Sequence, residues 1–384
     1  MRITFISTRT GMAGGDRVMH IYAKALKERG HSVCLVTRPM AIPLKKRVRS
    51  LLTGRGLPPR LVTGPTFFSA SSYEYRIAAP IRPIDASELP DADVVIATWW
   101  ETAEWVQKYP ASKGKKVHFV QHYEAFPGIP KNRVDAVLRL PMYKITISRW
   151  LSDMLKKEFG ASRVALVPNS VDFEQFHASP RGKQKQPTLG MLYSGHPSKD
   201  CRTGFRAFAV VREKHPDARL LMFGATAPLV SLPVPREAVL TQFPPQDRIR
   251  DIYAACDVWL CSSTSEGFGL PVLEAMACRC PIVSTAVGGP IDLITEGVDG
   301  FLTPIGDAAA MADRANAILA MPDADWRKMS DAAYAKATSY SWSDAVDRFE
   351  AALNEAAQAP DQPASGAAEL ERRGAGQVSA KDAA

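Results

Sequence analysis

Residues 265–277 read Ser265-Glu266-Gly267-Phe268-Gly269-Leu270-Pro271-Val272-Leu273-Glu274-Ala275-Met276-Ala277, and the fold can be predicted outward from them. The apolar run Val258-Trp259-Leu260-Cys261 before them is typical of a buried strand. Pro271 suits the first turn of a helix, where its missing N–H costs nothing. The order strand, glycine loop, helix puts unpaired N–H groups and the positive end of a helix dipole at the carboxyl edge of a sheet. The stretch therefore predicts a ligand site in an α/β fold.

The stretch also holds two carboxylates, Glu266 in the loop and Glu274 one turn into the helix. A carboxylate repels a phosphate, but it accepts hydrogen bonds from hydroxyl groups such as those of sugar and ribose. We therefore expect both glutamates to contact hydroxyl groups of a ligand. Two glutamates at this spacing occur by chance in many chains, so the whole string is the stronger signal.

The whole string resembles the E-x7-E signature of the retaining glycosyltransferases of family four, which have the GT-B fold. The resemblance implies an α/β architecture of two doubly wound, Rossmann-like domains that face each other across a cleft. It implies that Glu274 holds the ribose of a nucleotide and that Glu266 contacts the donor sugar. The N–H groups of Phe268, Gly269 and Leu270 would then face sugar hydroxyls or phosphate.

Length and composition fit a two-domain protein of this kind. The chain has 384 residues, 46% hydrophobic and 23% charged, and no apolar run approaches the length of a membrane span. Its first residues pass directly into a strand pattern without a signal-peptide cleavage site, which indicates a cytoplasmic protein. The six cysteines lie mostly in apolar segments and are interpreted as reduced core residues. The net charge of +8 favours an anionic partner, but no nucleic-acid recognition motif is present.

The expected domains follow from the element pattern. An N-terminal, acceptor-side domain is predicted over 1–178 and a nucleotide-sugar-binding domain over 188–340, with a polar linker between them. A helix over 341–357 crosses back to the first domain in the GT-B fold. Residues 360–384 consist of small and charged residues and are predicted to be disordered.

In the first domain, Gly14 and Gly15 lie in the predicted loop between a strand and the helix Arg17–Glu28. The dinucleotide pattern G-x-G-x-x-G is absent, which argues against a redox enzyme. The resemblance implies that the glycine pair approaches the donor diphosphate and that His122, after a strand, lies near the phosphates and the reacting sugar. The alternatives are an ordinary tight turn and a structural histidine. Trp99 and Trp100 either stack on an acceptor sugar or pack a helix.

A basic stretch follows this first βαβ unit. Between Arg38 and Ser72 there is no acidic residue, and the basic residues are Arg38, Lys45, Lys46, Arg47, Arg49, Arg55 and Arg60. Leucines and a valine are interleaved with them at helical spacing. Residues 38–60 therefore predict either contact with an anionic membrane surface or acceptor, or a solvated helix beside the acceptor site.

The second domain shows both matches to the family pattern and departures from it. Lys199 matches a lysine that contacts the donor diphosphate, and Asn169, in the passage between the domains, is expected to bind the donor. Ser170 replaces a family glycine, so the turn must differ or be strained. An arginine of the family is missing, and Arg202 is an open candidate to replace it. Arg279 also replaces a glycine, at a cost of roughly 1 kcal/mol if its backbone is left-handed.

These inferences predict a retaining, metal-independent glycosyltransferase of the hexosyltransferase type. The aspartate pairs at 91 and 93 and at 323 and 325 lie outside the expected site, so no metal is predicted. The donor is a nucleoside-diphosphate sugar, no cofactor is needed, and the acceptor is a bacterial surface polysaccharide or a lipid-linked glycan. A nucleotide-sugar epimerase and a catalytically inactive sugar-nucleotide-binding relative are the alternatives. The protein is placed in the cytoplasm, with contact to the inner face of the membrane as an open possibility.

Overall fold

The chain folds into two α/β units, each organised around one parallel sheet. The structure, a computed structural model, describes residues 1–8, 11, 13–41, 44–52, 57, 61–62, 66–68, 71–79, 83–225 and 227–360. Unit 1 comprises Met1–Ile147, Leu151–Val167 and the residues from Val346 on, and unit 2 comprises Ser148–Trp150 and Pro168–Ala345. The tail that the sequence predicts to be disordered lies, from residue 361 on, outside the described residues.

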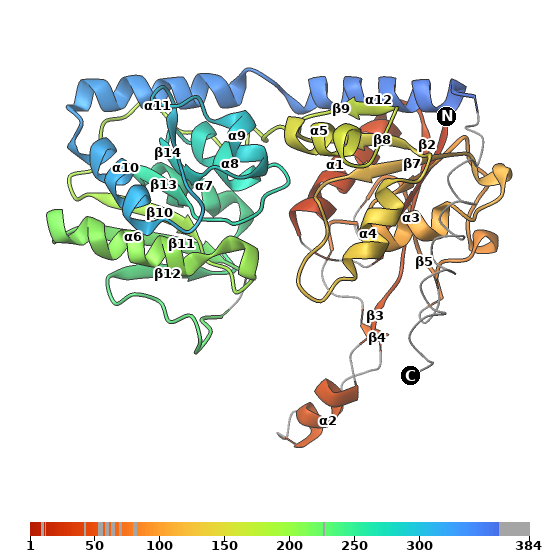
Figure 1. Cartoon of the computed structure of the whole chain (residues 1–384), viewed down its shortest axis with the longest axis horizontal. Coiled ribbons are helices and arrows are strands. Elements are labelled where there is room, and N and C mark those ends of the chain that lie inside the picture. Colours follow the sequence, from red (N-terminus) through yellow and green to blue (C-terminus); the bar gives the residue numbers. More distant parts are fainter. Residues whose placement is uncertain are drawn as a thin grey trace, which may run out of the picture. The chain divides into compact units, whose positions relative to one another are not determined.

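Unit 1 is organised around a parallel sheet of seven strands in the order β5-β2-β1-β6-β7-β8-β9 (Figure 1). Its strands are β1 (Arg2–Ile6), β2 (Ser32–Thr37), β5 (Glu74–Ile77), β6 (Val94–Ala97), β7 (Lys115–Val120), β8 (Tyr143–Thr146) and β9 (Val164–Leu166). A short antiparallel pair, β3 (Met40–Ala41) and β4 (Leu61–Val62), forms a separate ribbon. The strand order reverses between β1 and β6, so the loops that follow these two strands diverge at the carboxyl edge.

The helices of unit 1 connect these strands, as parallel strands require. They are α1 (Gly14–Glu28), α2 (Leu44–Leu52), α3 (Trp100–Val106), α4 (Lys131–Leu138) and α5 (Arg149–Lys157), with the 3₁₀ turns η1 (Ala86–Glu88) and η2 (Ala111–Lys113). The last helix, α12 (Trp342–Gln358), packs on the unit from Val346 on. Its buried Phe349 stacks on Tyr22 of α1, with ring centroids 4.1 Å apart. Aromatic burial therefore fixes the end of the described chain to unit 1.

Unit 2 repeats the design with a parallel sheet of six strands in the order β12-β11-β10-β13-β14-β15. The strands are β10 (Thr188–Leu192), β11 (Arg219–Gly224), β12 (Ala238–Gln242), β13 (Val258–Cys261), β14 (Ile282–Thr285) and β15 (Gly300–Thr303). Here the order reverses between β10 and β13. Ligands of doubly wound sheets bind in the crevice outside the carboxyl ends of strands at such a reversal.

Helices cover both faces of this sheet, as Figure 1 shows. They are α6 (Cys201–Lys214), α7 (Ile249–Ala254), α8 (Leu270–Ala277), α9 (Gly288–Leu293), α10 (Ala308–Ala320) and α11 (Asp323–Thr338), with the 3₁₀ turns η3 (Pro197–Lys199) and η4 (Gln246–Arg248). The core beneath α6 and α10 includes Leu189, Met191, Phe208 and Met311. All six cysteines are free, and five of them are buried, as the sequence predicts.

The opposite face of the sheet is packed around Trp259 of β13, which is 1% exposed. Its ring lies on Tyr253 of α7, with centroids 4.5 Å apart. Gly190 of β10 leaves the space for this ring, since a Cβ built on Gly190 would lie 2.4 Å from Trp259 Cε3 and 2.5 Å from Cys256 Sγ. The absence of a side chain at Gly190 therefore sets how closely α7 approaches the sheet.

The start of α1 and the backbone at Ser170 differ from what the sequence predicts. Helix α1 begins at Gly14, three residues before the predicted start, and the Asp16 carboxylate accepts the Ala13 N–H at 3.3 Å in its first turn. The glycine pair is thus the start of a helix and not a loop. Ser170 does not adopt a left-handed conformation, and its Oγ donates to the Tyr340 carbonyl at 2.6 Å. The strain considered for Ser170 is therefore absent.

Arg279 does have the left-handed backbone that the sequence suggested, with φ +59°. Its Nε donates to the Ala178 carbonyl at 2.9 Å, its guanidinium pairs with Asp331, and its Cζ lies 4.1 Å from the centroid of the Tyr334 ring. These contacts offset the cost of the backbone conformation, so an arginine is tolerated at a position where glycine would adopt this conformation more easily.

Adding one methyl group at Gly190 should destabilise unit 2. Gly190→Ala forces a Cβ against Trp259 and Cys256, and overpacking of this kind costs about 1–3 kcal/mol. Val239→Ala, at a side chain of β12 that is 57% exposed, is the control and should change stability by less than about 0.5 kcal/mol. Denaturant unfolding followed by circular dichroism measures both. Equal stability of Gly190→Ala and the parent would contradict the packing described.

Candidate functional site

The strand reversal of unit 2 brings together the two charged side chains that the sequence singled out. Lys199 ends the η3 turn that follows β10, and Glu266 lies in the loop that follows β13. Because β10 and β13 are neighbours in the sheet, these two connections meet at its carboxyl edge. The candidate site is therefore built from segments that are 67 residues apart in the chain.

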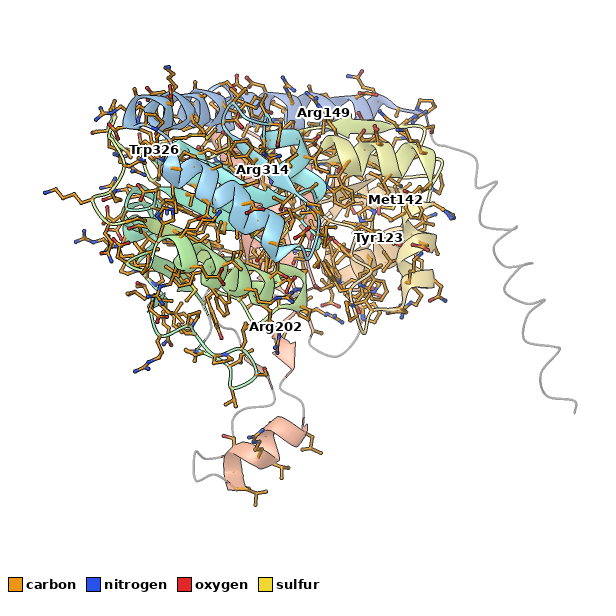
Figure 2. All side chains as sticks on the ribbon, turned by 60° about the vertical axis from the view of Figure 1, so that its left-hand side comes forward. Tyr123, Met142, Arg149, Arg202, Arg314 and Trp326 are labelled. Carbon is orange, nitrogen blue, oxygen red and sulfur yellow. The ribbon has the colours of Figure 1, made fainter. Side chains whose placement is uncertain are left out.

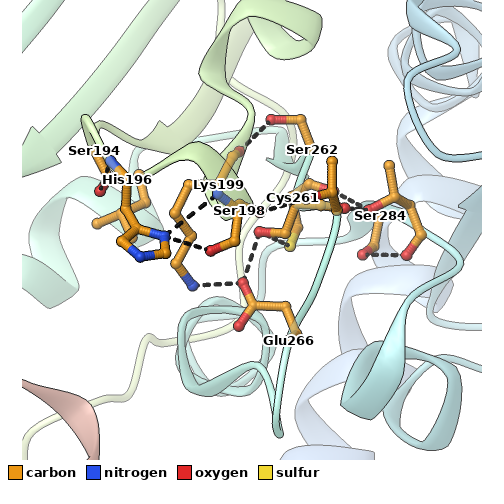
Figure 3. Close-up of polar contacts among 12 residues, drawn as sticks. Ser194, His196, Ser198, Lys199, Cys261, Ser262, Glu266 and Ser284 are labelled. Carbon is orange, nitrogen blue, oxygen red and sulfur yellow. Dashed lines mark hydrogen bonds and ion pairs between the residues drawn. The ribbon is translucent and has the colours of Figure 1, made fainter. Parts of the chain in front are cut away.

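Lys199 and Glu266 form an ion pair, drawn in Figure 3, with Nζ 2.6 Å from Oε1. The Glu266 side chain is only 9% exposed and that of Lys199 is 26% exposed. Burial lowers the pKa of Lys199, but the adjacent Glu266 carboxylate outweighs this, and the pKa lies above the ordinary lysine value. Lys199 is therefore an ammonium ion at neutral pH, with a positive charge available to an anionic ligand.

Further hydrogen bonds hold the segments after β10 and β13 in place independently of this pair. Ser262 Oγ donates to the carbonyls of Lys199 and Asp200, at 3.1 and 2.9 Å. The Thr264 N–H donates to the Ser198 carbonyl at 2.8 Å. Asp200 has φ +37° and caps α6, where its Oδ2 accepts the Thr203 hydroxyl at 2.6 Å. An aspartate can thus adopt this left-handed conformation, because its side chain bonds locally.

The loop between Glu266 and α8 presents unpaired backbone donors. None of the N–H groups of Phe268, Gly269 and Leu270 donates a hydrogen bond within the part of the chain that the structure describes. Gly269 caps α8 with φ +91°, a conformation that disfavours any other residue. These donors and the helix dipole supply positive potential beside Lys199.

A second glycine pair fixes the position of this loop. A Cβ on Gly288 would lie 1.9 Å from the Glu266 carbonyl oxygen, and one on Gly289 would lie 2.0 Å from that of Phe268. The first residues of α9 therefore pack directly on the loop backbone. The sequence shows this pair after a strand, but the pattern alone does not identify what it approaches.

Glu274 lies in α8, where it is 8% exposed, and Tyr253 of α7 holds its carboxylate. The Tyr253 hydroxyl donates to Glu274 Oε2 at 2.9 Å. Tyr253 is itself fully buried against Trp259. The two glutamates of the opening stretch are thus both anchored, Glu266 by Lys199 and Glu274 by Tyr253.

Two further predicted donor contacts belong to unit 2. The guanidinium of Arg202, labelled in Figure 2 on α6, donates to the Ser231 carbonyl at 2.5 Å. It is thereby tied to the segment after β11, and among the described residues no hydrogen bond or ion pair joins it to Lys199 or Glu266. Asn169 is 3% exposed, and its Oδ1 accepts no hydrogen bond from the described residues. Donor binding by both residues stays a prediction.

The remaining candidates belong to unit 1. Gly14 and Gly15 are the first residues of α1, and His122 follows β7. The Nδ1–H of His122 donates to the Tyr123 carbonyl at 2.8 Å, which leaves Nε2 unprotonated in the neutral ring. Trp100 is buried and packs α3, whereas Trp99 is half-buried and stacks on Phe126. Roles for Gly14, Gly15 and His122 in binding a ligand stay predictions.

A buried acid that was not predicted from the sequence lies beside these tryptophans. Glu124, 4% exposed, accepts the Trp100 N–H at 2.7 Å, and burial raises the pKa of its carboxyl group well above the ordinary value. Ser263 and Tyr253 were also not predicted. Ser263 lies two residues after β13 and three residues before Glu266, which is a weak signal. Nothing in the sequence distinguishes Tyr253 from other core tyrosines.

No group of three or more His, Cys, Asp or Glu side chains is placed to hold a metal within the described ranges. Asp93 pairs with Arg2 at 2.8 Å and Asp91 with Lys113 at 2.9 Å, both ahead of β6. The same part of the chain contains no helix long and apolar enough to cross a membrane.

Residues 172–336 match the family model described as glycosyl transferases, group 1. Among curated relatives, N-acetyl-alpha-D-glucosaminyl L-malate synthase of Bacillus anthracis is 42% identical over 74 residues, 19% of each chain. D-inositol 3-phosphate glycosyltransferase of Pseudarthrobacter chlorophenolicus is 32% identical over 210 residues, 49% of this chain and 50% of that protein. The chain thus spans about a fifth to a half of the length of these two relatives.

Solved structures extend the likeness to almost the whole chain, at the level of the fold. Anabaena HepE in complex with UDP-glucose has a TM-score of 0.71 at 16% identity, covering 92% of this chain and 100% of that chain. Sucrose-phosphate synthase from Thermosynechococcus elongatus has a TM-score of 0.67 at 17% identity, covering 92% and 98%. The chain has the GT-B fold, and its residues 172–336 match the group 1 glycosyl transferases.

Proposed function

We propose that this protein is a retaining glycosyltransferase that moves a sugar from a nucleoside-diphosphate sugar to an acceptor hydroxyl. The observation that carries the proposal is the Lys199–Glu266 pair, which lies beside the unpaired N–H groups of the 268–270 loop. A cation, backbone donors and a helix N-terminus suit a diphosphate, and a carboxylate suits a sugar hydroxyl. The match of residues 172–336 to the group 1 family supports the same reading.

The chemistry follows from these groups. Departure of the nucleoside diphosphate builds negative charge, which the Lys199 ammonium and the N–H groups of Phe268, Gly269 and Leu270 stabilise. Glu266 accepts a hydrogen bond from the transferred sugar, and Glu274 accepts one from the ribose. The acceptor hydroxyl attacks on the face that the diphosphate leaves, and the departing phosphate takes its proton. Such a same-face reaction retains the anomeric configuration, which NMR of the product determines.

The acceptor in this proposal is a bacterial surface polysaccharide or a lipid-linked glycan. A thermal-shift screen of nucleotide sugars identifies the donor, since a ligand at 100 times its Kd adds about 2.7 kcal/mol of stability. Anabaena HepE has the same fold and binds UDP-glucose, so UDP-sugars are the first to test. An epimerase would convert the nucleotide sugar without an acceptor, and an inactive relative would bind it without releasing the sugar.

Contact of residues 38–60 with an anionic membrane is a further part of the proposal. Helix α2 exposes a series of large apolar side chains: Leu44 at 68%, Val48 at 43%, Leu51 at 54% and Leu52 at 81%. Arg47 and Arg49 lie on the same helix. Exposed leucines among basic residues are typical of helices that lie on anionic lipid surfaces. A protein held there in the cytoplasm would meet a lipid-linked acceptor.

Substitution of Glu274 should affect nucleotide binding, whereas substitution of Glu266 should affect turnover. Glu274→Gln removes the charged acceptor of a hydrogen bond from the ribose, so it should weaken binding of nucleoside diphosphate and of intact donor by roughly ten- to hundredfold. Glu266→Gln should leave the affinity for nucleoside diphosphate nearly intact and reduce turnover, because its contact is to the sugar that is transferred. Calorimetric titration and steady-state rates measure both. The reverse pattern would exchange the two roles. If neither variant changes binding or turnover, the site is refuted.

Transfer should not depend on a divalent metal, because Lys199 and the loop N–H groups supply the positive charge that a metal would otherwise bring. The measurement is the rate of transfer in EDTA, with the same assay after addition of Mg²⁺ or Mn²⁺ as the control. Loss of activity in EDTA and its recovery with metal would contradict this account of the diphosphate.

Neutralising the basic side chains of α2 should release the protein from anionic vesicles. Exchange of Lys45, Lys46, Arg47 and Arg49 for glutamine should weaken binding by about 1 kcal/mol per charge near the surface. Co-sedimentation with vesicles containing phosphatidylserine measures the effect, and neutral phosphatidylcholine vesicles are the control. If the parent protein does not bind anionic vesicles, the membrane contact is refuted while the donor site stands.

A further inference from the structure

A buried hydroxyl group is bonded to the carboxylate of Glu266. Ser263 is 3% exposed, and its Oγ donates to Glu266 Oε1 at 2.6 Å. The Lys199 ammonium donates to the same oxygen, also at 2.6 Å (Figure 3). Oε2 accepts no hydrogen bond from any described residue. One oxygen of the carboxylate is therefore held by two donors, and the other is left for a ligand.

The backbone of Ser263 is itself fixed by the next strand of the sheet. Thr285 of β14, fully buried, donates from its Oγ1 to the Ser263 carbonyl at 2.5 Å and to the Cys261 carbonyl at 3.3 Å. Ser263 thus has little freedom to follow a carboxylate that moves. A donor with a fixed position defines the rotation of the group that it binds.

Tyr253 has the corresponding place beside Glu274. It is 0% exposed, its ring packs against those of Trp259 and Phe223, and its hydroxyl donates to Glu274 Oε2 at 2.9 Å. Close packing of the buried ring restricts the position of the hydroxyl. The two acids of the site are therefore each bonded to a buried hydroxyl that comes from another segment.

We propose that Ser263 and Tyr253 are positioning residues of the donor site, Ser263 for turnover through Glu266 and Tyr253 for nucleotide binding through Glu274. The inference rests on the proposed function, since it takes from it the ligand that each glutamate contacts. Ser263 turns Glu266 so that Oε2 is presented to the transferred sugar. Tyr253 fixes the carboxylate of Glu274 in the orientation in which it accepts the ribose hydroxyl.

A positioning role of Ser263 or Tyr253 and a contribution to fold stability change different measured quantities. Loss of any buried hydroxyl destabilises the fold by leaving a bonded partner unsatisfied. Lower fold stability does not act selectively on nucleotide binding or on turnover. Misorientation of Glu266 acts on the reacting sugar and so lowers kcat, whereas misorientation of Glu274 acts on the nucleotide and so raises Kd and KM. The split between kcat and KM therefore separates positioning from stability.

The test uses the full chain with Ser263→Ala, Ser263→Thr and Tyr253→Phe. Ser284→Ala is the matched control, since Ser284 is an equally buried serine of β14 whose Oγ donates to the Thr285 carbonyl at 3.0 Å and not to either glutamate. Calorimetry with UDP, GDP and ADP gives nucleoside diphosphate affinity, steady-state kinetics with the accepted donor give kcat and KM, and thermal unfolding gives stability.

Ser263→Ala should lower kcat by roughly three- to tenfold, the equivalent of one net hydrogen bond, and leave the Kd of the diphosphate within about twofold. Ser263→Thr keeps the hydroxyl and should recover most of the turnover. Tyr253→Phe should raise the Kd of the diphosphate by roughly three- to tenfold and leave kcat at saturating donor unchanged. The control should change stability alone.

Two results would overturn the inference in different ways. If the parent binds diphosphate and transfers sugar, but Ser263→Ala and Tyr253→Phe behave like Ser284→Ala, the hydroxyls serve stability only and the positioning roles are wrong. If Ser263→Thr is as slow as Ser263→Ala, the hydroxyl is not what Glu266 needs. A parent that binds none of the three diphosphates contradicts the proposed function itself, and with it the ligand assigned to each glutamate.

Discussion

The charge pair of Lys199 and Glu266 is the interaction on which the candidate site of unit 2 depends. A carboxylate with 9% of its side chain exposed requires a partner, because an unpaired charge in that position would lose its hydration without compensation. The pair can form only if the connections after β10 and β13 lie side by side, and the reversal of strand order between these strands ensures that they do. The same pair gives the site one positive and one negative group, which suits the proposed donor, a diphosphate linked to a sugar.

Close backbone packing turns this pair into a defined site. Gly288 and Gly289 allow the first residues of α9 to lie against the carbonyls of Glu266 and Phe268, where a Cβ would be about 2 Å from each oxygen. Gly269 supplies the left-handed turn that starts α8 and leaves the loop N–H groups unpaired. The glycines of this region therefore have different roles. Gly269 allows the left-handed backbone conformation, and Gly288 and Gly289 allow the close approach of α9 to the loop.

The α/β architecture could be predicted from the sequence because apolar strand patterns alternate with helical patterns along the chain. Apolar runs such as 258–261 and 219–224, each followed by a helical pattern, predict parallel strands, and both strands have the predicted bounds. Glu266, Lys199 and the 268–270 loop could be chosen because they follow strands at the carboxyl edge. Ser263 and Tyr253 could not, since their importance depends on which atom each hydroxyl reaches. Arg202 illustrates the same limit, because its position in the sequence did not reveal that it binds the Ser231 carbonyl.

The central claim is that the donor diphosphate binds to unit 2 at the loop between β13 and α8. Hydrogen–deuterium exchange of the protein with and without the nucleoside diphosphate tests it most directly, because the claim names N–H groups that lack partners in the described chain. Peptides that cover Phe268, Gly269 and Leu270 should exchange more slowly when the ligand is bound, and so should peptides that cover Lys199. Protection confined to other segments, with exchange of these peptides unchanged at saturating ligand, would contradict the account.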